Sequence, residues 1–144
     1  MDIHKFMQPP DIGDRDVLVK ATESDWVQTD KDGKAFIKVL WTNPDSGGWA
    51  VLYKWLKGFV APAHKHLGSV HNLVISGKMQ VRDMVLEAGD YQYEANGMIH
   101  ETTTALEDTI HLNIADGPIL FFNDNGFTHY AGWEQMYAVQ HRIK

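Results

Sequence analysis

Cysteine is absent from the 144-residue chain, which excludes disulfide bonds, thiolate metal ligands and a cysteine nucleophile. No stretch approaches the roughly 20 apolar residues of a membrane-spanning helix, and residues 1–8 lack the pattern of a signal peptide. A net charge of −6 argues against a broad basic surface for nucleic acid or anionic membrane. These absences favour a cytoplasmic protein with small-molecule or protein partners, in which any metal is held by nitrogen and oxygen atoms.

The chain is rich in short β-type segments separated by turn residues. Its length fits one domain, and we expect residues 1–144 to form it, with residues 1–33 as an extended arm containing one or two short strands. The expected strands beyond the arm are residues 36–41, 49–56, 70–75, 78–84, 89–94, 101–104, 109–114 and 119–123. Residues 132–142 carry apolar side chains at helical spacing, which predicts a short C-terminal helix. This pattern predicts an all-β fold, a sandwich or a barrel.

Three histidines are candidate metal ligands. His64 and His66 lie two residues apart in a β-type segment, so their side chains share one face of the strand. His100 follows a turn at Gly97, where another strand would re-enter a barrel. Three imidazoles with open coordination positions suit zinc, iron, nickel or copper better than magnesium or calcium. The residues therefore predict a site for one divalent transition metal.

The segments around these histidines resemble the two signature motifs of the cupin superfamily. The first motif is Gly-x5-His-x-His-x(3,4)-Glu-x6-Gly, and its matching residues are Gly58, His64, His66 and Gly77, with His71 in the glutamate place. The second motif is Gly-x5-Pro-x-Gly-x2-His-x3-Asn, and its matching residues are Gly89, Gly97 and His100, with Ala95 and Thr104 in the proline and asparagine places. The resemblance covers residues 49–104. It implies a single-domain cupin, which is a double-stranded β-helix or jelly-roll barrel.

Within the cupins, the chain resembles the small dioxygenases that cleave carbon–carbon bonds, of the acetylacetone and 2,4'-dihydroxyacetophenone dioxygenase type. The likeness to the former extends into residues 117–126 and 132–133. It implies Fe(II) in the active form, with zinc or nickel as alternatives in purified protein, held by His64, His66 and His100. It also implies O2 and a small carbonyl compound, a β-diketone or hydroxyketone, as substrates.

Two alternatives to a dioxygenase remain open. More distantly, the chain resembles the zinc-binding cupin domain of anti-sigma factors, which implies a sensory or regulatory module without catalysis. A cupin isomerase or hydrolase that uses another metal is the third interpretation. In each case we expect a homodimer, because cupin barrels commonly bury a sheet edge or face against a second subunit and the arm is long enough to cross over.

Several other polar residues are weaker candidates. His71 is expected as a fourth metal ligand beside the three histidines. A role as a hydrogen-bond partner of the ligands, or as a base in the pocket, is also open. Asp83 and Glu94 could supply a carboxylate ligand or base, but such residues more often lie on a solvated strand face. His111 and Asn113 share one face of their strand, which is either the pocket face or the solvent face. No catalytic residue is assigned beyond the metal ligands.

Overall fold

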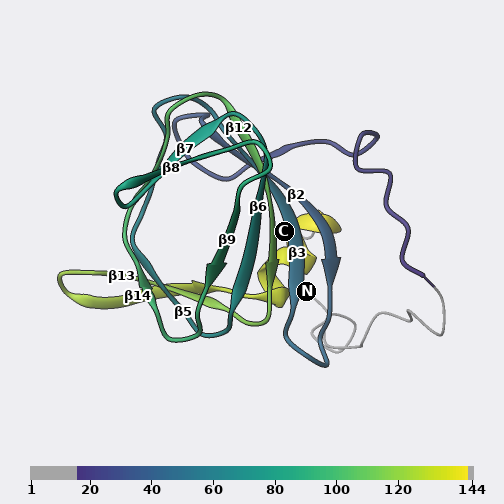
Figure 1. Cartoon of the computed structure of the whole chain (residues 1–144). Helices are drawn as coiled ribbons and strands as arrows, with labels where there is room; N and C mark the ends of the chain where they lie inside the picture. Colours follow the sequence, from purple (N-terminus) through teal and green to yellow (C-terminus); the bar gives the residue numbers. More distant parts are fainter. Residues whose placement is uncertain (1–15, 143–144) are drawn as a thin grey trace.

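A computed structural model of the chain describes residues 16–142 (Figure 1). Over this range the chain forms short strands followed by one helix near its C-terminus. The strands are β1 (Val27–Gln28), β2 (Ala35–Thr42), β3 (Trp49–Trp55), β4 (Val60–Ala61), β5 (His64–His66), β6 (Val70–Ser76), β7 (Lys78–Val81), β8 (Met84–Glu87), β9 (Tyr91–Glu94), β10 (Ile99–His100), β11 (Thr103–Ala105), β12 (Thr109–Ala115), β13 (Ile119–Asn123) and β14 (Gly126–Ala131). The helix is α2 (Trp133–Gln140).

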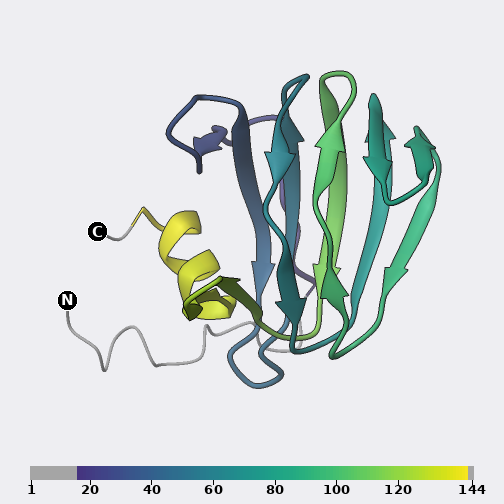
Figure 2. The same ribbon diagram turned by 90° about the vertical axis from the view of Figure 1, so that its left-hand side faces the viewer.

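The strands pair antiparallel in one six-stranded and two four-stranded sheets. The orders are β1-β2-β3-β12-β6-β9, β10-β5-β13-β14 and β4-β11-β7-β8. Figure 2 shows the six-stranded sheet with α2 beside its β2 end. The predicted all-β fold with a short C-terminal helix is confirmed. No helix within residues 16–142 is long and apolar enough to cross a membrane.

The register of the six-stranded sheet sorts its side chains into rows that face either the inside or the outside of the barrel. One inner row, aligned across β3, β12, β6 and β9, is Val51, Asn113, Asn72 and Gln92. The neighbouring outer row is Ala50, Ile114, His71 and Tyr93. Consecutive residues on a strand point to opposite faces, so Asn72 is buried while His71 is exposed. The middle of the inner face is therefore polar, which is unusual for a barrel core.

Two apolar clusters lie inside the barrel on either side of the polar residues Asn113, Asn72 and Gln92. The larger cluster is Ile37, Trp49, Val51, Val70, Ala115, Ile119 and Met136. Through Met136, α2 covers one end of the barrel. The smaller cluster is Val74, Met79, Val81 and Leu86, packed against Trp55. Residues of both clusters also line a cavity of about 480 Å³.

The structure differs from the sequence-based expectation at β7 and β8 and by the additional strands β4 and β14. The expected strand over residues 78–84 is instead the first part of a hairpin over residues 78–87, formed by β7 and β8, with Arg82 at a φ of 54° in the turn. Strand β14 was not predicted, since its exposed residues lack the alternation that marks a strand. Of the proposed arm, residues 1–15 lie outside the described residues, and β1 is the strand found in the rest.

One motif glycine has a clear structural reason. Gly77 adopts a φ of +88°, and a Cβ there would collide with the carbonyl oxygen of Asp108. The chain therefore needs glycine to turn from β6 into β7 while staying against the start of β12.

Candidate metal centre

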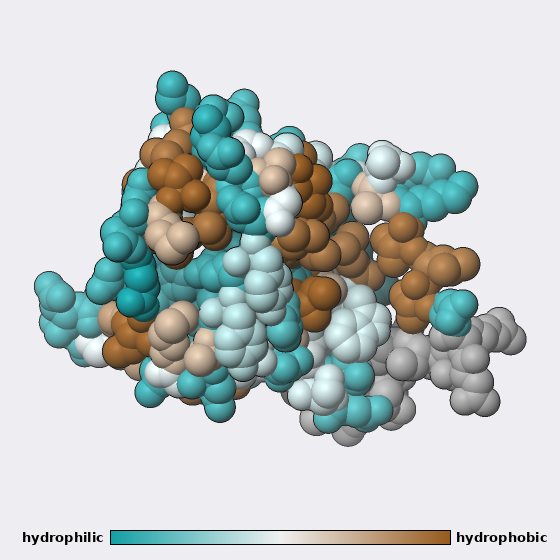
Figure 3. All heavy atoms as spheres, viewed as in Figure 1, coloured by the Kyte–Doolittle hydropathy of each residue, from teal (hydrophilic) through white to brown (hydrophobic). Residues whose placement is uncertain are grey.

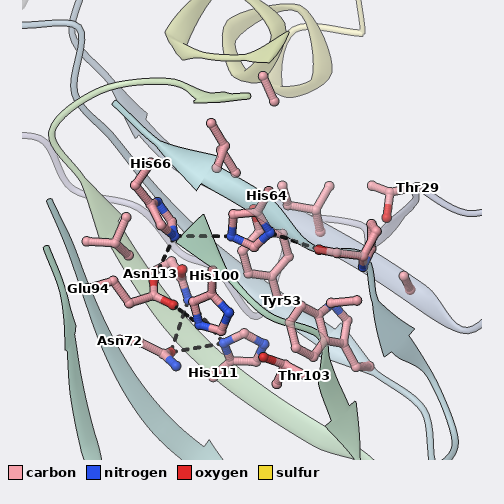
Figure 4. Close-up of a pocket in the computed structure, with 18 of the residues that line it drawn as sticks. Thr29, Tyr53, His64, His66, Asn72, Glu94, His100, Thr103, His111 and Asn113 are labelled. Carbon is pink, nitrogen blue, oxygen red and sulfur yellow. Dashed lines mark hydrogen bonds and ion pairs between the residues drawn. The ribbon is translucent and has the colours of Figure 1, made fainter. Parts of the chain in front are cut away.

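The three predicted histidines come together at one end of the cavity. His64 and His66 lie on β5, and His100 lies on β10 directly opposite His64 in the antiparallel register. The Nε2 atoms of His64 and His66 are 3.1 Å apart. Glu94, from the end of β9, completes the cluster: its Oε2 is 3.5 Å from His66 Nε2, and its Oε1 contacts His100 Nε2. Figure 4 shows these four side chains pointing toward one another.

His71 does not join this cluster, which corrects the expectation of a fourth histidine ligand. Its side chain is exposed on the outer face of β6, and its Nδ1 lies 2.5 Å from the hydroxyl of Tyr91. It does not line the cavity. The reason is strand alternation, because the inward positions of β6 are Val70 and Asn72 on either side of it. The carboxylate near the histidines comes from β9 instead.

Backbone carbonyl groups determine which ring nitrogen His64 and His100 each turn toward the cluster. Nδ1 of His64 donates to the carbonyl oxygen of Pro62 at 2.9 Å. Nδ1 of His100 donates to the carbonyl oxygen of Glu101 at 2.6 Å. In the neutral rings, Nε2 then carries a lone pair that faces the cluster. This tautomer and this support from the other ring nitrogen are what metal-binding histidines require.

The two histidines of β5 are spaced as two ligands of one transition metal ion would be. A separation of 3.1 Å between the two Nε2 atoms of β5 is that of two ligands about 2.1 Å from one ion at roughly a right angle. Within residues 16–142 no group of three or more His, Asp or Glu side chains is already arranged to hold a metal ion. His100 and Glu94 contact each other directly. A proton or a metal cation must lie between Nε2 of His100 and the carboxylate of Glu94. Metal binding would therefore release a proton.

The electrostatics of the cluster favour neutral rings at His64 and His66 and an ionised Glu94, but draw His100 toward its protonated form. Burial lowers the pKa of His66 to about 4 and also lowers the pKa of His64, so both rings are neutral at neutral pH. Burial alone would raise the pKa of Glu94, but the hydrogen bond with His100 and the nearby imidazoles outweigh it and hold the pKa below its usual value. Burial opposes protonation of His100 as well, yet Glu94 raises its pKa. The result is an ionised carboxylate among imidazoles.

The other candidate residues divide between the cavity and the surface. His111 and Asn113 are inside and line the cavity. Asp83 is exposed in the turn between β7 and β8. Glu94 was a weak candidate in the sequence, and the signal that could have promoted it is the alternation in β9, whose buried or half-buried positions are Gln92 and Glu94. The exposed Tyr91 and Tyr93 occupy the alternate positions.

The cavity beside the cluster has the size of a small-molecule site. Its volume of about 480 Å³ lies within the roughly 300 to 1,000 Å³ typical of ligand pockets. Most of its lining is apolar or aromatic, and Phe121 stacks on His129 with ring centroids 4.6 Å apart. Figure 3 shows the surface hollowed on this side of the molecule, with hydrophilic residues inside the hollow and hydrophobic residues around it.

Glu94 is expected to support metal binding. Replacing it with glutamine keeps the shape of the side chain but removes the negative charge beside His66 and His100. We expect Zn²⁺ affinity to fall about 10- to 100-fold, as for other groups that support metal ligands. Competition with a chromophoric chelator measures the change, and Glu87→Gln, the same substitution at the surface, is the control. Equal affinities for wild type and Glu94→Gln would contradict this role.

Comparison with known proteins places the chain in a family. The family model described as the ChrR cupin-like domain matches residues 14–120. No curated protein matches the sequence.

Solved structures show the same fold at low sequence identity. A Methylibium petroleiphilum PM1 protein provisionally described as an acetylacetone dioxygenase has a TM-score of 0.81 at 24% identity, with 88% of this chain and 94% of that chain covered. An acetylacetone dioxygenase from Acinetobacter johnsonii has a TM-score of 0.81 at 22% identity, with 90% and 94% covered. The anti-sigma factor ChrR of Rhodobacter sphaeroides, solved with SigE, has a TM-score of 0.57 at 24% identity, with 65% and 50% covered. Since the family model spans most of the sequence, the chain belongs to the ChrR cupin-like domain family and has the cupin fold.

Proposed function

We propose that the protein is a metal-dependent dioxygenase, with Fe(II) as its active metal, that cleaves a carbon–carbon bond in a small β-diketone or hydroxyketone. The observation that supports this best is the cluster of His64, His66 and His100 with Glu94 at the end of a largely apolar cavity. The fold shared with acetylacetone dioxygenase structures agrees with it.

Each part of the site has a role in this proposal. His64, His66 and His100 would hold the metal through Nε2. When bound, the metal supplies a Lewis acid that favours the enolate of a chelating substrate and a centre that reacts with O2. The aromatic walls at Trp55 and Phe121 exclude water and orient the substrate carbon skeleton beside the histidines.

Glu94 changes the charge balance expected from the histidines alone. Three neutral imidazoles would leave both positive charges of a divalent ion uncompensated. The ionised Glu94, buried against His66 and His100, reduces the net charge of the centre to about one. A substrate that binds as a monoanion would neutralise the rest, so the site favours an enolate over a neutral ketone or a dicarboxylate.

Oxygen consumption with defined substrates tests the proposal. Protein purified without added metal is analysed for its metal, reloaded with Fe(II), Zn(II), Ni(II) or Mn(II), and assayed in an oxygen electrode with pentane-2,4-dione and a panel of diketones and hydroxyketones. We expect one O2 consumed per substrate cleaved with Fe(II), and label from ¹⁸O2 in both products. His64→Ala is the inactive control. Absence of oxygen uptake with every metal and substrate would contradict the proposal.

A sensory module is the second candidate, favoured by the family that matches the sequence. ChrR was solved in complex with SigE, and a module of that kind would hold zinc without turnover. The same experiment separates the two candidates. Tight zinc retention together with no oxygen uptake under any condition would favour the sensory module, whereas stoichiometric cleavage with Fe(II) would favour the enzyme.

The outer face of the six-stranded sheet supports the expected homodimer. One outer row across four strands is entirely apolar or aromatic: Leu52, Leu112, Leu73 and Tyr91. Leu73 and Tyr91 are 39% and 57% exposed, and exposed apolar rows of this kind mark protein interfaces. A second copy of the chain would cover the row.

Sedimentation at micromolar concentration tests this dimer. We expect wild type to sediment as a dimer and Leu73→Lys to weaken association by about tenfold or more, because a buried lysine lacks a partner in an apolar interface. Val85→Lys places the same charge on an exposed position of β8, in another sheet, and is expected to leave association unchanged. A monomeric wild type would refute the dimer.

A further inference from the structure

A row of three amide side chains crosses the inner face of the six-stranded sheet and ends at the metal centre. Asn113 on β12, Asn72 on β6 and Gln92 on β9 lie directly opposite one another in the register, and all three line the cavity. Nδ2 of Asn113 donates to Oδ1 of Asn72 at 3.0 Å, and Nδ2 of Asn72 donates to Oε1 of Gln92 at 3.2 Å. Figure 4 shows Asn72 and Asn113 beside the histidine cluster. We call these three residues the amide row.

The buried end of the amide row sets its direction. Oδ1 of Asn72 is within hydrogen-bond distance of two nitrogens, Nδ2 of Asn113 at 3.0 Å and Nδ1 of His111 at 2.9 Å. An amide oxygen only accepts and an amide nitrogen only donates, so the oxygen of Asn72 faces β12 and its nitrogen faces β9. Turning over the amide of Asn72 or Gln92 would set two N–H donors against each other, which is costly where Asn72 is 3% exposed. The amide row therefore turns the nitrogen of Gln92 toward the histidine cluster.

The nitrogen of Gln92 meets a histidine whose lone pair is already in use. Nε2 of Gln92 is 3.1 Å from Nε2 of His100. Because Nδ1 of His100 donates to the carbonyl oxygen of Glu101, Nε2 carries the single lone pair of the ring. Oε1 of Glu94 contacts the same atom, so a proton or a metal cation between His100 and Glu94 uses that lone pair. An N–H group of Gln92 is therefore left beside the cluster for an acceptor that a ligand can supply.

The charges of the centre give this N–H group a specific use. The imidazole rings present lone pairs to the cluster, and the ionised Glu94 is a negatively charged acceptor against two of them. None of these groups can donate a hydrogen bond to the anionic oxygen of a ligand on the metal. The amide of Gln92 is a neutral donor beside them, and a hydrogen bond to a charged oxygen is stronger than one to a neutral atom. The amide therefore favours ligands that coordinate through an anionic oxygen.

We infer that Gln92 is a specificity-determining residue of the metal centre, which donates a hydrogen bond to the anionic oxygen of a ligand bound beside His100 and is held in this orientation by the amide row. The inference rests on the proposed function for the presence of a metal at the histidine cluster. It assigns to Gln92 the selection of an enolate or carboxylate oxygen over a neutral nitrogen ligand. Substitution of Gln92 should therefore change which ligands the metal accepts without changing how tightly the protein holds the metal.

Two small probes of different chemistry test the role of Gln92. Acetate coordinates through an anionic oxygen that keeps lone pairs, whereas the bound nitrogen of imidazole has none left to accept a hydrogen bond. Each probe is titrated into Co(II)-loaded protein and followed by the visible absorption of the metal. We expect Gln92→Leu to weaken acetate binding about 10- to 100-fold and to change imidazole binding by less than about threefold.

Controls separate the hydrogen bond from structural effects. Gln80→Leu makes the same substitution on β7, outside the cavity, and should bind both probes as wild type does. Asn72→Leu removes the donor that holds the amide oxygen of Gln92, so it should lose part of the acetate affinity and keep the imidazole affinity. Gln92→Met, which also lacks a donor, serves if Gln92→Leu does not fold.

Three outcomes would overturn the inference. The first is equal acetate affinity in wild type and the folded Gln92 variants, and the second is an equal loss of acetate and imidazole affinity. The third is a fall in Zn²⁺ affinity beyond the roughly 10- to 100-fold seen for groups that support ligands, because Gln92 would then be a metal ligand itself. Competition with a chromophoric chelator measures the Zn²⁺ affinity, which we expect to change by less than about threefold.

The two probes also distinguish this inference from the proposed function, because neither needs O2. If acetate binding depends on Gln92 while the Fe(II)-loaded protein consumes no O2 with any substrate, the dioxygenase proposal fails and the role of Gln92 remains. If the Fe(II)-loaded protein cleaves diketones while Gln92→Leu binds acetate as tightly as wild type, the role of Gln92 fails alone.

Discussion

Replacement of His66 by alanine is expected to abolish metal retention, whereas replacement of His71 by alanine leaves it unchanged. His66 is 3% exposed, and its Nε2 lies beside both His64 and Glu94. Loss of a direct ligand should weaken retention by more than the roughly 10- to 100-fold seen for groups that only support ligands. His71 lies in the six-stranded sheet, on the outer face of β6 and away from the cavity. Metal content after dialysis against a mild chelator, compared for wild type and both variants, measures the difference.

The His71→Ala variant is the matched control for this experiment, since it removes an imidazole from β6, in another sheet, without touching the cavity. Circular dichroism and thermal unfolding show whether each variant keeps the fold, because removal of the buried His66 ring also leaves a small cavity. If His71→Ala loses metal as completely as His66→Ala, the inward and outward faces of β6 are assigned the wrong way round. Full retention by His66→Ala would remove the histidine cluster as the metal site.

Acid is expected to destabilise the metal-free protein because His111 is buried in its neutral form. Its pKa is about 3 in the folded protein because of burial, against about 6.5 in an unfolded chain. Between these two values the unfolded state binds the extra proton and the folded state does not. The contribution of His111 to stability is therefore full above pH 6.5 and is lost at about 1.4 kcal/mol per pH unit as the pH falls toward 3.

Urea unfolding of metal-free wild type and His111→Phe at pH 6.5, 5.5 and 4.5 measures this loss. Other groups titrate in the same window: burial lowers the pKa of His66 to about 4, which adds to the acid loss, and Glu94 raises the pKa of His100, which opposes it. The difference between the two proteins isolates His111. As the pH decreases, we expect the free energy of unfolding to fall less steeply for His111→Phe than for wild type. The difference in slope should correspond to about one bound proton. Parallel pH profiles would show that His111 is protonated in the folded protein.

A considerable part of the fold and the site could be predicted from residues close together in the sequence. Alternation within a strand places His64 and His66 on one face, whatever lies on either side of the sheet. Turn residues between short β-type segments indicate an all-β fold, and the glycines and His100 at motif spacing indicate a cupin. These features depend on local geometry, which the neighbouring residues are sufficient to specify.

Which face of a strand is inside depends on pairing between distant segments, and only the tertiary structure decided it. His71 and Asn72 are adjacent in sequence, yet the register of β6 with β9 and β12 turns Asn72 inward and His71 outward. The same pairing brings Glu94 to the histidines and buries His111 beside Tyr53. Alternation fixes which side chains share a face, but a shift of one residue in register would exchange the two faces. The sequence alone therefore determined that the two histidines of β5 share one face, and the tertiary structure determined which carboxylate and which polar side chains surround them.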